Sequence, residues 1–131
     1  MAKLLSGKGV TTNVTIGGPP QGMKWIVKYA LIVLHTGTGT GSRQADIRIS
    51  LARAGVYSSN VPILASTGSI SSTSTAASAL GYPINVSASP GQLTIFYQFP
   101  EIYAVDSIYL NVTLILGDTV DYYIMVEEVV A

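Results

Sequence analysis

Apolar and polar side chains alternate with a period of two along much of the chain, which is the pattern of β-strands. The longest run without a helix breaker or turn residue covers residues 23–36. One face of this predicted strand is apolar and is expected to lie in the core: Trp25, Val27, Tyr29, Leu31 and Val33. The opposite face begins with Lys24 and Lys28 and becomes apolar in its second half. A strand with one solvated face would stay polar there, so the second face needs a cover of its own.

The same alternation predicts seven further strands. They cover residues 10–16, 43–53, 61–65, 84–88, 92–99, 106–116 and 119–130, separated by turns rich in Gly, Pro and Ser. The Gly-rich residues 37–42 predict a hairpin between the strands on either side. About eight short antiparallel strands predict an all-β fold, a β-sandwich. Long strands near the start and at the end of the chain favour a jelly roll over an immunoglobulin-like sandwich.

The length of 131 residues fits one domain with a sizeable core. We expect residues 10–131 to form a single β-sandwich domain and residues 1–9 to form a flexible N-terminal arm, loosened by Gly7 and Gly9. Residues 67–80 consist mostly of small side chains. They are expected to be a linker, or a weak strand with a loop.

The charged fraction is 11% and the net charge is zero, whereas roughly 25% charged residues is usual. The chain therefore lacks a basic surface for nucleic acid. It suits packing against other protein, although an unusually neutral β protein would look the same. There is no cysteine, which excludes disulfides and thiolate metal sites. No segment has the length of a signal peptide, and the apolar run at residues 29–34 is too short to span a bilayer. We expect synthesis in a cytoplasm and no membrane partner.

Motifs for catalysis are missing from the pattern. The Gly-rich residues 37–42 lack the Lys-Ser/Thr pair of a phosphate-binding loop, and no GxSxG sequence surrounds a serine. His35 is the only histidine, so a triad would need it. Asp106, Asp118 and Asp121 could serve a glycosidase or a Ca²⁺ site only by converging, and as turn stabilisers they need no such role. We predict no catalytic residue, no cofactor and no metal site.

Interface residues are predicted from apolar and aromatic side chains on outward faces. Four come from the second face of residues 23–36, and three come from the last strands: Ile26, Ala30, Ile32, Leu34, Tyr109, Ile115 and Tyr123. Tyr109 and Tyr123 are expected to meet across a hairpin. Either another segment of the same chain or a second subunit would cover these side chains.

Three sequence features together carry a resemblance. They are Pro19-Pro20-x-Gly22-x-x-Trp25-x-Val27, the segment RQADIRI at residues 43–49, and DSIYL at residues 106–110 before DYYI at residues 121–124. The chain resembles small β-sandwich proteins of tailed phages and is similar in style to jelly-roll capsid decoration proteins.

The resemblance implies a non-enzymatic structural protein of the virion, made in the host cytoplasm. It implies a homo-oligomer, a trimer in the first place, that binds and stabilises the outer shell through the major capsid protein or another virion protein. The alternative is a carbohydrate-binding module or adhesin that uses exposed aromatic residues. A third possibility is an enzyme built on the aspartates and His35.

Overall fold

The computed structural model describes residues 1–49, 63–70, 83–104 and 107–131, and for residues 100–104 it describes the backbone alone. This part of the chain contains nine strands and no helix. The strands are β1 (Ala2–Val10), β2 (Val14–Gly17), β3 (Met23–His35), β4 (Gln44–Ile49), β5 (Ile63–Ser66), β6 (Pro83–Ser89), β7 (Gln92–Ala104), β8 (Ile108–Thr113) and β9 (Thr119–Val130).

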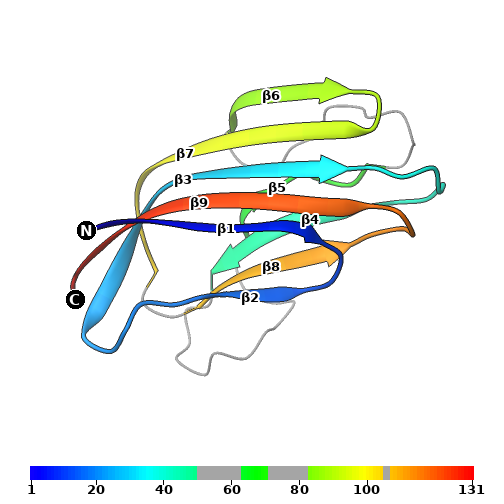
Figure 1. Cartoon of the computed structure of the whole chain (residues 1–131). Helices are drawn as coiled ribbons and strands as arrows, with labels where there is room; N and C mark the ends of the chain where they lie inside the picture. The colour runs from blue at the N-terminus through cyan, green and yellow to red at the C-terminus, as the bar shows by residue number, and fades with distance from the viewer. Residues whose placement is uncertain (50–62, 71–82, 105–106) are drawn as a thin grey trace.

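The strands form two antiparallel sheets packed face to face (Figure 1). A five-stranded sheet has the order β1-β9-β3-β7-β6, and a four-stranded sheet has the order β2-β8-β4-β5. Strands from the two halves of the chain pair in a nested way: β1 with β9, β2 with β8, β3 with β7 and β4 with β5. Rolling up such a nested antiparallel strip produces a jelly roll. The predicted jelly-roll-like β-sandwich is confirmed, with β6 as an additional strand beside β7.

Two local expectations are wrong. Residues 1–9 were expected to be a flexible arm, but Ala2–Val10 is a strand whose backbone pairs with β9 from Ala2 to Val10. The predicted hairpin around residues 37–42 does not form, because β3 and β4 belong to different sheets. Residues 36–43 instead cross from one sheet to the other. The remainder of the predicted strand at 43–53, from residue 50 on, and most of residues 67–80 lie outside the described residues.

The core lies between the sheets and is built from alternate side chains of the long strands. β9 contributes Val120, Tyr122, Ile124 and Val126, and β7 contributes Leu93, Ile95 and Tyr97. The side chains of Ala45, Ile47 and Ile49 face them from β4. This regular alternation is the sequence pattern that predicted the strands. Gly7 belongs to the same packing, since a Cβ there would lie 2.6 Å from the ring of Tyr122.

A β-bulge at Lys28 reverses the faces of β3. Val27 pairs with Val126 of β9 while Tyr29 pairs with the adjacent Met125, so Lys28 is an extra residue. The register with β7 also breaks here, between Ile102 and Gln98. The break in β7 contains Pro100, which has no N–H to donate to a ladder.

The bulge corrects the predicted core. Before it, Trp25 and Val27 are buried as expected. After it, the buried side chains are Ala30, Ile32 and Leu34, each with no exposed surface. Tyr29, Leu31 and Val33, which were predicted to lie in the core, are on the outer side of the five-stranded sheet and are only partly buried. A one-residue change of register moves every following side chain to the opposite face.

Deleting Lys28 should therefore be far more damaging than replacing it. The deletion removes the bulge and drives Tyr29, Leu31 and Val33 toward the space of three smaller or differently shaped core residues. We expect a loss of more than about 4 kcal/mol in the free energy of unfolding, or no folding at all. Lys28→Ala is the control, because it loses only the exposed 3.4 Å ion pair with Glu127, worth about 1 kcal/mol or less. Urea unfolding measures both, and equal stabilities would contradict the role of the bulge.

Candidate functional site

The outer face of the five-stranded sheet carries a continuous group of apolar side chains. They come from four neighbouring strands, and we call them the outer face: Leu4 of β1, Tyr123 and Met125 of β9, Tyr29, Leu31 and Val33 of β3, and Phe96 of β7. Each alternates along its strand with residues that point into the core. The group therefore lies on the side of the sheet opposite to the sandwich interior.

Cross-strand pairing places these side chains in rows. Leu31 lies between Tyr123 and Phe96, its partners on β9 and β7. Met125 lies between Leu4 and Tyr29 in the adjoining row. The rings of Tyr29 and Phe96 are 5.3 Å apart between centroids and are inclined by 39°. Neighbours on one face of a sheet contact each other at this spacing, so the outer face is a single patch.

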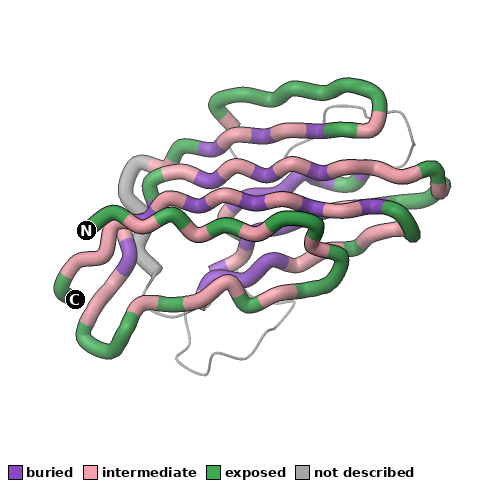
Figure 2. Tube along the Cα trace, viewed as in Figure 1, coloured by how far each residue is buried: buried purple, intermediate pink, exposed green. Residues whose placement is uncertain are grey.

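No described segment lies over the outer face. The five-stranded sheet is in front of the four-stranded sheet in Figure 1, with its outer side toward the viewer. In Figure 2 the central strands of this sheet alternate between buried and intermediate residues. Leu4 is 54% exposed. Mutual packing thus covers the patch only in part, and its upper side faces solvent.

Charged side chains at both ends of the outer face are paired within the chain. At one end Lys28 lies 3.4 Å from Glu127. At the other, His35 Nε2 lies 3.1 Å from Asp121 Oδ2, and the backbone N–H of Gly9 donates to Asp121 Oδ1 at 2.9 Å. Burial raises the pKa of Asp121, but the hydrogen bonds from Gly9 and His35 outweigh it and leave the pKa below its usual value. The rim is thus close to neutral.

The predicted interface residues are divided by the structure. Ala30, Ile32 and Leu34 are wholly buried core residues, for the reason given by the bulge, and cannot contact another subunit. Tyr109 is also fully buried. The remaining three, Ile26, Ile115 and Tyr123, keep some exposure, but only Tyr123 lies on the outer face.

Tyr109 and Tyr123 do not meet across a hairpin, because β8 and β9 lie in different sheets. Tyr29, Leu31, Val33, Phe96, Met125 and Leu4 were missed as surface residues. A signal for them was the single charged residue Lys28 inside an apolar run, which reads as a disturbance of the alternation.

The predicted acidic group is not brought together. Asp121 contacts His35, whereas Asp118 is buried at the turn before β9 and contacts Arg43. Asp106 lies outside the described residues. Within residues 1–49, 63–70, 83–104 and 107–131, no group of three or more His, Asp or Glu side chains could hold a metal ion.

Asp118 instead fastens two loops at one end of the sandwich. Its carboxylate accepts hydrogen bonds from Arg43 Nε at 2.7 Å, from Gly37 N at 2.7 Å and from Ile115 N at 2.9 Å. Arg43 Nη2 also donates to the carbonyl of Gly39 at 2.7 Å. Both charged side chains have no exposed surface. The pair fixes the crossover at residues 36–43 to the turn between β8 and β9.

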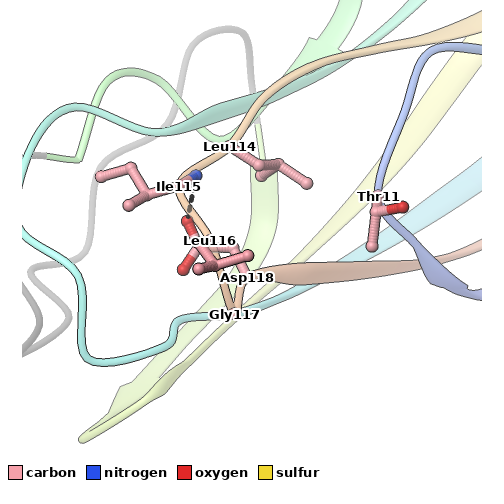
Figure 3. Close-up of a pocket in the computed structure, with 6 residues that line it drawn as sticks. All are labelled: Thr11, Leu114, Ile115, Leu116, Gly117 and Asp118. Carbon is pink, nitrogen blue, oxygen red and sulfur yellow. Dashed lines mark hydrogen bonds between the residues drawn. The ribbon is translucent and has the colours of Figure 1, made fainter.

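A pocket of about 200 Å³ lies beside this turn (Figure 3). It is lined by Thr11, Leu114, Ile115, Leu116, Gly117 and Asp118. Asp118, the carboxylate in its wall, is already bonded to Arg43 and two backbone N–H groups. The rest of the lining is apolar or backbone apart from the Thr11 hydroxyl, so the pocket presents no acid–base pair for chemistry.

Comparisons with family models, with curated proteins and with solved structures find no match to this chain. In the described part of the chain, no helix is long and apolar enough to cross a membrane.

The buried pair should make Asp118 a major determinant of stability. Asp118→Ala leaves the Arg43 charge buried without its partner, so we expect a loss of about 3–5 kcal/mol in the free energy of unfolding. Asp121→Ala is the comparison, since its ion pair with His35 is partly exposed, and it should cost about 1 kcal/mol or less. Chemical denaturation compares the two, and similar losses would contradict this account.

Acid should act through the same carboxylate. Burial raises the pKa of Asp118, but the hydrogen bonds from Arg43, Gly37 and Ile115 outweigh it and hold the pKa below its ordinary value of 3.8. A carboxyl with a lowered folded pKa contributes stability above its unfolded pKa and loses it as the pH falls through the folded pKa. Stability should therefore fall below about pH 4. Denaturation at several pH values should show a shallower fall for Asp118→Ala than for the parent protein.

Proposed function

We propose that this chain is a non-enzymatic structural protein that assembles with copies of itself through the outer face of its five-stranded sheet. The supporting observation is the uncovered apolar patch around Leu31, flanked by Tyr123 and Phe96. Contiguous apolar patches on a surface are typical of protein contacts. The charges at its rim are already paired within the chain, so they do not repel a second copy.

The size of the outer face is sufficient for such a contact. With about 4.8 Å between strands and about 3.4 Å per residue, the sheet from β1 to β6 and from Lys28 to His35 measures roughly 19 by 24 Å. With side chains standing on it, the accessible surface of this area approaches the roughly 800 Å² per partner of a standard interface. Its apolar centre and polar rim also match the usual anatomy of interfaces.

The proposed place of this assembly is the outer shell of a virus particle, as a capsid decoration protein that acts as a trimer. The resemblance to jelly-roll decoration proteins supports this, together with the jelly-roll fold and the low charge of the chain. Stabilisation would come from buried area between subunits and between the oligomer and shell proteins. Co-sedimentation of the purified protein with emptied phage capsids tests the contact with the shell.

A second candidate function is carbohydrate binding by the aromatic side chains of the outer face. Tyr29 and Phe96 are in contact, and Tyr123 lies on the same surface beside Leu31. Exposed aromatic rings with a polar edge are suited to sugar faces. Glycan-array binding that is lost in Tyr123→Ala, with the oligomer unchanged, would favour this function over assembly.

Leu31→Asp should separate the subunits without unfolding them. Leu31 is at the centre of the outer face, so a carboxylate there would be buried against apolar side chains of the next copy. We expect light scattering at micromolar concentration to show an oligomer, three chains by the resemblance, for the parent protein and a monomer for the variant. Circular dichroism should show that the variant remains rich in β-structure.

Leu116→Asp is the matched control, because Leu116 is 96% exposed at the turn before β9 and lies outside the outer face. It should keep the mass of the parent oligomer. A parent protein that is monomeric at micromolar concentration contradicts the proposed assembly, as does a variant Leu31→Asp that retains the full mass.

A further inference from the structure

The strand β6 extends the five-stranded sheet beyond the sandwich. Among the described residues it pairs only with β7, on one side. Six of its seven residues are exposed, including Ile84 at 63% and Val86 at 36%. Figure 1 shows β6 at the outer margin of the sheet, beyond β7. Its free edge presents backbone N–H and C=O groups to solvent.

The other three edge strands are less suited to pairing with another chain. β1 carries Lys3 and Lys8, and its register breaks between Gly7 and Val10. β2 and β5 have only four residues each. Short edges, edge lysines and bulges are the usual means by which proteins prevent edge-to-edge association. β6 has seven residues and no charged side chain, so it lacks the first two of these protections.

We propose that β6 pairs antiparallel with β6 of a second copy about a two-fold axis, which joins two five-stranded sheets into one continuous sheet. A two-fold contact brings the same surface of both copies together, and a strand without charges meets no repulsion from itself. This contact does not depend on the outer face and would link one assembly to the next.

The direction of the strands favours this partner over β1. Each neighbour in the order β1-β9-β3-β7-β6 is antiparallel to the next, so β1 and β6 run in the same direction. Copies related by translation would pair β6 with β1 in parallel, which is the less stable ladder. They would also place Lys3 and Lys8 against an uncharged strand.

Side chains of β6 complete the contact. Val86 and Ala88 pair with Ile95 and Leu93 of β7, which point into the core. The two β6 side chains thus project on the inner side of the sheet, where they are exposed. With full overlap of two antiparallel β6 strands, Val86 of one copy lies opposite Val86 of the other. The pairing therefore buries apolar surface as well as backbone groups.

Cysteine cross-linking tests the pairing directly, since the chain has no cysteine of its own. Opposite residues of an antiparallel pair have Cα atoms about 4.5–5.5 Å apart, which a disulfide can bridge. Val86→Cys should form disulfide dimers under mild oxidation at least about tenfold faster than Thr113→Cys, an exposed site on β8. Asn85→Cys mixed with Ser87→Cys should give the mixed dimer.

Two further variants decide the outcome. Val86→Cys combined with Leu31→Asp should cross-link as before, which separates this contact from the outer face. Without any cysteine, Val86→Lys should weaken two-fold association at least about tenfold relative to Val86→Thr. Cross-linking of Val86→Cys no faster than that of Thr113→Cys would overturn the proposal. Preferential cross-linking of Val86→Cys with Ser6→Cys on β1 would also overturn it, in favour of a head-to-tail contact.

Discussion

The extra residue at Lys28 is the constraint on which both surfaces of the five-stranded sheet depend. β3 is the central strand of that sheet and pairs with β7 and β9 along most of its length. Because the bulge shifts its alternation by one, Ala30, Ile32 and Leu34 enter the core and Leu31 reaches the outer side. The small Ala30 directly follows the break. The same backbone irregularity therefore completes the core and creates the apolar patch.

A second constraint operates at the end of the sandwich where β3 passes to β4. A jelly roll needs crossovers between its sheets, and this one, at residues 36–43, contains three glycines. Such a segment has little apolar surface with which to hold itself in place. The buried pair of Arg43 and Asp118 supplies the missing order through hydrogen bonds to Gly37, Gly39 and Ile115. Buried ion pairs add little net stability over apolar packing but fix geometry where a partner must not be lost.

The sequence was sufficient for the fold class and for most strands, because alternation is a local property. β9 matches its predicted range, and Ile108, Leu110, Val120 and Ile124 are buried as their faces predict. Strand partners and bulges depend on contacts between distant segments. The hairpin between β3 and β4 therefore failed, since a Gly-rich linker permits a tight turn and a crossover equally well. The outer face failed for the same reason, since alternation continued unbroken through Lys28 exchanges the two faces.

The distribution of charge connects the fold with association. The chain has seven basic and seven acidic residues besides His35, and eight of these fourteen form four ion pairs: Lys3 with Glu128, Lys28 with Glu127, Arg43 with Asp118 and Arg48 with Asp46. Two of the pairs hold strands or loops together inside the protomer, and Glu128 also accepts a hydrogen bond from Trp25. Charges paired in this way contribute little repulsion between copies. An apolar sheet face and an uncharged edge strand on such a surface favour association, because desolvating them leaves few unpaired charges.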